Sequence, residues 1–275
     1  MRKRIIMEKE TNLIYQDIKN SKRIVIKVGT STLTYDTGKM NIKRIDTLAR
    51  TLSDLHNSGK DIVLVSSGAV GAAMGKLGIS ERPSETNIKQ ALAAVGQCEL
   101  MYLYDKLFSE YHNTVAQVLL TKDDISVPNR MNNTKSTFNT LLEMGIIPIV
   151  NENDTVSTEE LEIGDNDNLS ALVAELVGAD LLILFSDIDG LYDSDPHTNP
   201  DAKIIPLVKN VDDVKSLAGG AGSKRGTGGM ITKLEAAKRA TSAGINMIIA
   251  NGNNIQALYD VFDGEELGTL FVSKN

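Results

Sequence analysis

The sequence predicts an α/β fold built on a central, mainly parallel sheet, and two observations indicate it. Short apolar runs alternate with longer amphipathic runs, which is the order of strands and helices in βαβ units. Most of the short runs are continuously apolar, as in parallel strands that helices cover on both faces. The predicted strands are Arg23–Val28, Asp61–Ser66, Thr114–Leu119, Ile146–Val150, Leu181–Phe185 and Asn246–Ala250.

The amphipathic runs predict helices at residues 41–57, 69–77, 86–110, 133–144, 167–177 and 229–243. At the first of them Asn41 is a favourable N-cap, and apolar residues follow it at helical spacing. Cys98 lies in an apolar part of the helix 86–110, so we expect it to be a small core residue. The polar segment 158–164 alternates loosely, which suggests a short hairpin.

Length and composition limit the function classes. The 275 residues fit one large domain, which we place at 22–275 after an N-terminal extension of residues 1–21. A formal charge of −7 gives no general attraction to nucleic acid or to an anionic membrane. One cysteine excludes an intrachain disulfide, and the three histidines have no metal-ligand spacing. We therefore expect a cytoplasmic protein with no nucleic-acid or membrane partner.

Polar residues and glycines gather where the predicted strands end. Because ligands of open α/β sheets bind at the carboxyl ends of the strands, this rim is the predicted site. It comprises Lys27–Ser31 at the end of the first strand, Ser66–Ala69 at the end of the second, Asn151–Asp154 at the end of the fourth, and Ser186 and Asp187 at the end of the fifth.

Two of these rim positions have alternative interpretations. Lys27 closes an otherwise apolar strand, and it either directs a charge at a phosphate or extends into solvent. The following Gly29 permits a close approach of the backbone to an anion. Ser67 is either a plain helix cap or, with Gly68, part of an anion site at a helix N-terminus.

Two further segments precede predicted helices. The glycine-rich stretch Gly219–Gly229 is either a surface loop or a phosphate-binding segment, with Lys233 one turn into the next helix. The GDNDN segment, Gly164–Asn168, supplies one helix cap, and its other polar residues are available to bind Mg²⁺, orient lysines or contact a substrate. The sequence lacks the P-loop, dinucleotide-fold and protein-kinase motifs, which argues against those enzyme classes.

Seven segments together resemble the glutamate 5-kinase family of the amino acid kinase superfamily. They are IKVGTSTLT, VSSGAVGAA, QALAAVGQ, NENDTVST, IGDNDNLSALVA, SDIDGLYDSDP and GTGGMITKLEAA. The resemblance implies a three-layer αβα sandwich with about eight strands in its sheet. It also implies phosphorylation of the side-chain carboxylate of L-glutamate by ATP, with Mg²⁺ carried mainly by the ATP phosphates. The RNA-binding type of PUA domain found in many relatives is not expected here.

The resemblance also implies residue roles, position by position. Lys27 and Lys233 would stabilise the transferring phosphoryl group, and Asp167 would hold both lysines in place. The residues that would bind glutamate are Ser67, Gly68, Asp154, Asp165 and Asn166. Those that would bind ATP are Lys27, Gly29, Ser186, Asp187, Thr227, Gly228, Gly229, Met230, Ile231, Thr232 and Lys233.

The implied partners are L-glutamate and MgATP, proline as a feedback inhibitor, a second copy of the chain in a dimer or tetramer, and a glutamyl phosphate reductase. Two alternatives stay open. One is a kinase of the same fold that acts on N-acetylglutamate, carbamate, aspartate or UMP. The other is a sensor that binds a nucleotide or amino acid without catalysis, although such a sensor has no need of charges that serve only a transition state.

Overall fold

The computed structural model describes residues 14–35, 37–156, 166–196, 198–218 and 229–274. Within these residues eight strands form one sheet in the order β3-β4-β2-β1-β5-β7-β8-β6. All neighbours pair in parallel except β7 and β8, which are antiparallel, so the predicted mainly parallel sheet is confirmed. The strands are β1 (Arg23–Val28), β2 (Asp61–Ser66), β3 (Val115–Leu120), β4 (Ile147–Glu152), β5 (Leu181–Ser186), β6 (Leu207–Val208), β7 (Asn246–Asn251) and β8 (Thr269–Phe271).

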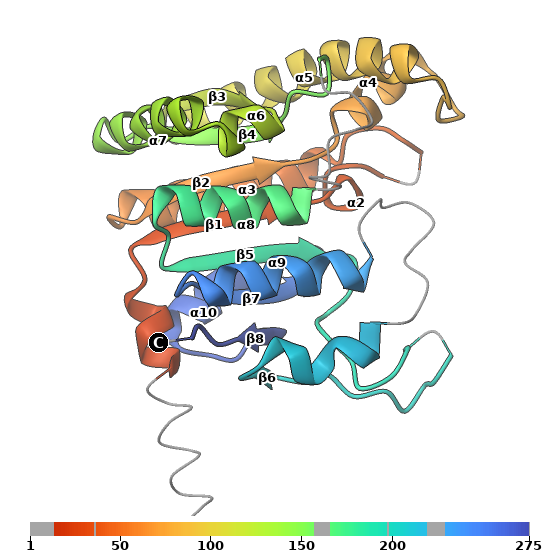
Figure 1. The fold of residues 1–275 in the computed structure, drawn as a ribbon. Coiled ribbons are helices and arrows are strands. Elements are labelled where there is room, and N and C mark those ends of the chain that lie inside the picture. The colour runs from red at the N-terminus through yellow and green to blue at the C-terminus, as the bar shows by residue number, and fades with distance from the viewer. Residues whose placement is uncertain (1–13, 36, 157–165, 197, 219–228, 275) are drawn as a thin grey trace, which may run out of the picture.

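Helices cover both faces of the sheet, which makes three layers (Figure 1). One face carries α2 (Thr30–Leu33), α3 (Ile42–Asn57), α4 (Ala69–Leu77), α5 (Thr86–Ser109) and α10 (Ala257–Asp263). The other carries α7 (Pro128–Glu143), α8 (Asn166–Val177) and α9 (Met230–Ser242). Two further short pieces are α6 (Lys122–Ser126) and a 3₁₀ segment at Val211–Ala218.

The two apolar cores follow from the alternation of side chains along each strand. In β1, Ile24 and Ile26 are buried with Leu48 of α3 on one face. Val25, between them, is buried with Leu169 of α8 on the other face. Lys27 shares the parity of Val25, so its side chain leaves the strand towards the α8 and α9 layer.

Several sequence predictions differ from the structure in detail. β6 and β8 were not predicted, because two or three residues are too short to show a period. The helix predicted at 133–144 begins earlier, at Pro128, a residue favoured in the first helical turn. The prediction for Cys98 is wrong, since its side chain is exposed. The buried stripe of α5 runs through Gly96 and Leu100 instead, so Cys98 falls outside it.

The end of the predicted N-terminal extension is helical, at residues 14–20. Tyr15 and Ile18 in this segment are buried in the same core as β1. Lys60 holds the segment in place, because its ammonium donates a hydrogen bond of 2.8 Å to the carbonyl oxygen of Ser21. The predicted hairpin at 158–164 lies outside the described residues.

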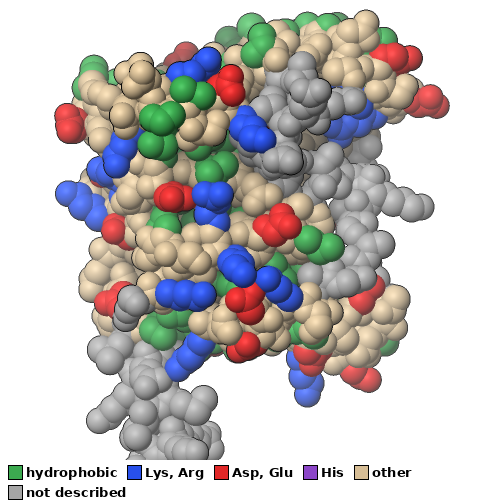
Figure 2. Space-filling model, in the orientation of Figure 1, with side chains coloured by type: hydrophobic (Ala, Val, Ile, Leu, Met, Phe, Trp, Pro, Cys, Tyr) green, Lys and Arg blue, Asp and Glu red, His purple; other side chains and the backbone are tan. Residues whose placement is uncertain are grey.

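Two surface properties bear on the expected partners. None of the described helices combines the length and the apolar character that crossing a membrane requires. On the face that α7, α8 and α9 cover, Lys and Arg side chains are mixed with Asp and Glu (Figure 2). This face therefore presents charges of both signs rather than one continuous field.

Helices α4 and α5 approach closely at Gly96. A Cβ atom at residue 96 would overlap the carbonyl oxygen of Ala69 and lie 2.9 Å from the backbone nitrogen of Ala73. We expect Gly96→Ala to lower the free energy of unfolding by about 1–3 kcal/mol, because backbone atoms must move apart. The measurement is chemical unfolding. Gly71→Ala in α4 is the control, since its new Cβ would meet side-chain atoms only, those of Thr30 at 3.2 Å and Thr34 at 3.8 Å. Equal stability of Gly96→Ala and the parent would contradict the prediction.

Candidate active site

Three charged side chains from three separate elements meet at the carboxyl edge of the sheet. The ammonium of Lys27, near the end of β1, lies 2.6 Å from Oδ1 of Asp167. The ammonium of Lys233, in the first turn of α9, lies 3.1 Å from Oδ2 of the same carboxylate. All three residues are buried, at 8%, 6% and 1% exposure for Lys27, Lys233 and Asp167. The structure therefore brings together the three residues that were assigned to catalysis.

The electrostatics of this group favour an anion. Burial alone would raise the pKa of Asp167, but the adjacent charges of Lys27 and Lys233 hold that pKa below its usual range. Asp167 also lies in the first turn of α8, where the helix dipole favours a negative charge. With Asp167 ionised and both lysines protonated, the group has a net positive charge. A phosphate is the natural ligand for two such buried ammonium groups.

The start of α9 supports this group. Gly229, in an extended conformation, is the N-cap, and its carbonyl oxygen accepts a 2.9 Å bond from the Thr232 hydroxyl. The same hydroxyl lies 3.4 Å from Oδ2 of Asp167. Met230 is half-buried and Ile231 is 57% exposed. Three other predicted site residues, Asp165, Thr227 and Gly228, lie outside the described residues.

A second group lies beside the first, at the end of β2. The side-chain nitrogen of Asn166, the first residue of α8, donates to the hydroxyl oxygen of Ser67 at 2.8 Å. Gly68 follows with φ of 100°, a left-handed conformation that L side chains rarely adopt, and it begins α4. The structure therefore joins Ser67, Gly68 and Asn166, three of the predicted substrate residues, next to the lysine pair.

Asp154 follows β4, the strand next to β2, and is half-buried. Burial raises the pKa of its carboxyl group to about 6, and the negative charge of Glu152 adds to the rise. The positive charge of Arg82, in the loop between α4 and α5, acts in the opposite direction. A carboxyl group that titrates this close to neutrality and faces a ligand edge is typical of a functional site.

Two of the predicted nucleotide residues, Ser186 and Asp187, lie at the end of β5, on the other side of β1. Ser186 is the last residue of β5 and is buried, and its hydroxyl donates a 3.0 Å bond to the carboxylate of the exposed Asp187. Gly29 follows β1, and a Cβ there would lie 3.6 Å from the Lys27 ammonium. The sheet order thus places the Ser67 and Asp154 strands on one side of Lys27 and the Ser186 strand on the other.

Sequence reasoning assigned no role to several residues that adjoin the site. Asn151, near the end of β4, is 3% exposed, and Gln97 of α5 is 9% exposed. Tyr104, two turns further along α5, shares a 2.8 Å hydrogen bond with the Ser66 hydroxyl. The available signal was a polar residue on the buried stripe of a helix, as at Gln97, or inside an apolar strand, as at Asn151.

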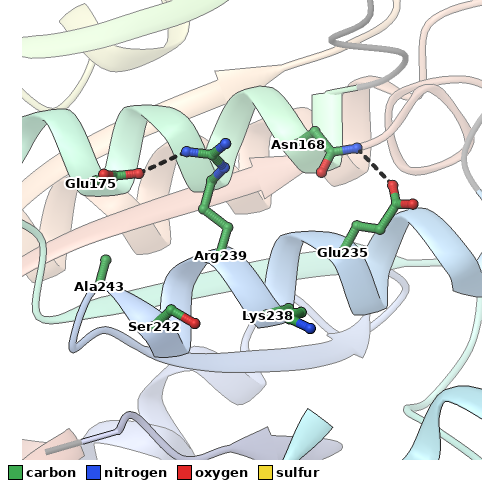
Figure 3. Close-up of a pocket in the computed structure, with 7 residues that line it drawn as sticks. All are labelled: Asn168, Glu175, Glu235, Lys238, Arg239, Ser242 and Ala243. Atoms are coloured by element: carbon green, nitrogen blue, oxygen red, sulfur yellow. Dashed lines mark hydrogen bonds and ion pairs between the residues drawn. The ribbon is translucent and has the colours of Figure 1, made fainter. Parts of the chain in front are cut away.

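A separate groove of about 500 Å³ lies between α8 and α9 on the outer surface (Figure 3). Glu175 and Arg239 form an ion pair of 2.9 Å across it, and Asn168 donates to Glu235 at 3.5 Å. These side chains bridge α8 and α9, the helices that carry Asp167 and Lys233, on the outer surface.

Comparison with known proteins gives concordant results. The model of the Amino acid kinase family matches residues 22–251. A glutamate 5-kinase from Clostridium perfringens is 57% identical over 262 residues, which cover 94% of this chain and 97% of that protein. A glutamate 5-kinase from Listeria monocytogenes is 53% identical over 264 residues, with 94% and 96% covered. A solved carbamate kinase from Giardia lamblia bound to AMP-PNP superposes with a TM-score of 0.66 at 18% identity over 93% of this chain and 100% of that one, and it shares the fold.

Proposed function

Because the chain belongs to the amino acid kinase family and is related to glutamate 5-kinases over nearly its whole length, we propose that it transfers the γ-phosphoryl group of ATP to the side-chain carboxylate of L-glutamate. The products are L-glutamyl 5-phosphate and ADP, and the reaction is the first step of proline biosynthesis. The observation that carries the proposal is the convergence of Lys27 and Lys233 on Asp167.

The proposed mechanism needs no general base. The glutamate carboxylate is ionised at neutral pH, so its oxygen attacks the γ-phosphorus directly while the bond to the ADP oxygen breaks. Lys27 and Lys233 neutralise the charge on the moving phosphoryl group, and Asp167 keeps both ammonium groups in place. Ser186, Asp187 and the start of α9 hold the nucleotide, and Ser67 and Asn166 hold the amino acid.

We propose that Mg²⁺ enters with the ATP phosphates. No group of three or more His, Cys, Asp or Glu side chains among the described residues forms a metal site. Mg²⁺ usually takes one or two carboxylates together with substrate phosphates and water, and the Asp187 carboxylate, on the nucleotide side, fits that pattern. When bound, the ion supplies charge neutralisation at the phosphates.

The proposed activity is tested with ATP, Mg²⁺ and hydroxylamine in the presence of each candidate acceptor. Hydroxylamine converts an acyl phosphate into a stable hydroxamate. We expect γ-glutamyl hydroxamate and ADP with glutamate, and no comparable turnover with N-acetylglutamate, carbamate, aspartate or UMP. Faster turnover with any of these four acceptors would assign the chain to another member of the fold. Nucleotide binding without any ADP release would favour a sensor.

Asp154 gives a prediction on pH. Its raised pKa means that it takes up a proton below about pH 6 rather than near 3.8, and the protonated form lacks the charge that would hold the glutamate ammonium. We expect glutamate affinity to fall as pH drops through about 6, and bound glutamate to shift that midpoint downwards. Calorimetric titration of glutamate without ATP is the measurement. Asp154→Asn should bind weakly at every pH without this step, and a pH-independent affinity in the parent would contradict the assignment.

We further propose that the chain assembles with a second copy of itself. Val95 and Tyr102 of α5 are 39% and 61% exposed, and with Cys98 they form an apolar strip suited to a second copy of the chain. Measurement of the mass in solution tests this homo-oligomer.

We also propose a cytoplasmic location, where both substrates occur. We propose inhibition by proline and transfer of the labile product to a glutamyl phosphate reductase. The loop before the GDNDN segment is the proposed place for proline, and residues 157–163 of that loop lie outside the described residues.

A further inference from the structure

A chain of amide hydrogen bonds connects the substrate edge to the middle of α5. The side-chain nitrogen of Asn166 donates to Oδ1 of Asn151 at 3.0 Å. The side-chain nitrogen of Asn151 donates in turn to Oε1 of Gln97 at 2.9 Å. Asn151 and Gln97 are both buried, so water does not compete for the bond between them.

A backbone N–H group fixes the donor and acceptor ends of each amide in this series of hydrogen bonds. The backbone N–H of Glu152 donates to Oδ1 of Asn151 at 2.9 Å. A backbone N–H is always a donor, so Oδ1 of Asn151 must face it, and the NH₂ group of Asn151 must face Gln97. Gln97 therefore has to present its carbonyl oxygen, because its NH₂ group would meet another NH₂ group.

The same argument fixes the orientation of Asn166. Its NH₂ group faces three acceptors, which are Oδ1 of Asn151, the Ser67 hydroxyl oxygen at 2.8 Å and the Ser66 carbonyl oxygen at 3.2 Å. A flipped amide would place Oδ1 of Asn166 against these oxygen atoms, which is repulsive. Oδ1 of Asn166 therefore points away from Asn151, Ser66 and Ser67.

The Ser67 hydroxyl is a donor, whereas Oδ1 of Asn166 is an acceptor. Its oxygen already accepts a hydrogen from Asn166, so its own hydroxyl hydrogen is directed to another acceptor. The edge therefore offers an acceptor at Asn166 and a donor at Ser67. An amino acid presents the matching pair, an ammonium donor and a carboxylate acceptor.

We propose that Gln97 is a positioning residue for substrate selection, which acts through Asn151 to keep Oδ1 of Asn166 facing the substrate ammonium. Gln97 lies beside Gly96, whose missing side chain allows α5 to approach α4, and this packing places the Gln97 amide next to the end of β4. The inference rests on the proposed function, since it assumes that the ammonium belongs to glutamate.

The test compares Gln97→Met, which keeps the length of the side chain but removes its acceptor, with Leu100→Met. Leu100 is 2% exposed and lies one turn along the same buried stripe of α5, so it reports general effects of repacking that helix. For Gln97→Met we expect the KM for glutamate to rise about tenfold, because the Asn151 amide loses its partner and Asn166 is no longer held. The KM for ATP, and both constants of Leu100→Met, should stay within about twofold of the parent.

A second measurement separates orientation from a general loss of structure. Glutarate lacks the amino group, so its inhibition constant against glutamate should be nearly unchanged in Gln97→Met. Gln97→Glu retains an acceptor oxygen facing Asn151 and should recover part of the lost glutamate affinity.

The outcomes keep the two proposals apart. If the parent does not phosphorylate glutamate, the proposed function fails. If the parent does so but Gln97→Met has the parent's KM for glutamate, or weakens glutamate and glutarate equally, Gln97 does not position Asn166. An equal rise in KM for Leu100→Met would also overturn the inference.

Discussion

Replacing Lys27 or Lys233 by alanine is expected to lower kcat for glutamate phosphorylation about 10²–10³-fold. Each ammonium is buried and is held by the carboxylate of Asp167, at 2.6 Å for Lys27 and 3.1 Å for Lys233. Both groups are therefore already oriented when the transition state forms. The two charges act on a transition state whose negative charge is spread over the equatorial and leaving oxygens, and the lost stabilisation therefore appears in kcat. The measurement is steady-state turnover with the hydroxylamine trap, on variants whose unfolding transition shows that they are folded.

Lys238 is a matched control on the same helix as Lys233. Its ammonium also contacts a carboxylate, that of Asp212 at 3.0 Å, but its side chain is 47% exposed and lies outside the site. We expect Lys238→Ala to retain kcat within about twofold, since exposed ion pairs contribute little. Near-parental turnover in Lys27→Ala or Lys233→Ala would refute the roles proposed for the two lysines.

Asp167→Asn is expected to lower the free energy of unfolding by about 3–5 kcal/mol. The change removes the negative charge from a carboxylate that is 1% exposed and leaves two buried ammonium groups without their shared counter-charge. Chemical unfolding at neutral pH measures the loss. Turnover should fall as well, because neither lysine is then held in place.

Asp212 provides an unusually close control for this variant. Its carboxylate also bridges two lysines, Lys215 at 2.7 Å and Lys238 at 3.0 Å, which lower its pKa to about 2. It is 46% exposed, so water screens its charge, and Asp212→Asn should leave the unfolding transition nearly unchanged. Similar losses in the two variants would show that burial of the Asp167 group is not what stabilises the protein.

The stability that Asp167 contributes also depends on pH, with a defined sign. Its pKa in the folded protein lies below the ordinary value of 3.8, so the unfolded chain binds a proton first as pH falls. The contribution is therefore complete above about pH 4 to 5 and is lost as pH falls through the folded pKa. Asp167→Asn should lack this part of the acid dependence, which acid unfolding of both proteins would detect.

Long periodic elements could be predicted from the sequence, whereas short ones could not. The bounds of β1 agree residue for residue with the prediction, because a run of six residues rich in strand formers is followed directly by Gly29. β6 and β8 hold two and three residues, and their pairing depends on distant partners rather than on local pattern. Cys98 shows a different limit, since an apolar stretch of helix does not reveal by itself which of its faces is buried.

The residues of the candidate site could also be predicted only in part. Lys27 stood out because a charge closes an apolar strand, and Asp154 because it follows one. Nothing near Gln97 in the sequence indicates that its amide meets that of Asn151, which is 54 residues away. Such contacts follow from helix packing, which here depends on the bare backbone of Gly96. Local patterns identify residues of unusual chemistry, and the fold decides which of them cooperate.

The position of β1 in the middle of the sheet has an evolutionary consequence. The residues proposed to bind the acceptor follow β2 and β4 on one side of it, and those proposed to bind the nucleotide lie at the end of β5 on the other, with Lys27 between them. Mutations that remodel the acceptor half therefore need not disturb the half that receives the phosphate donor. Such a division allows one scaffold to serve enzymes with unlike acceptors.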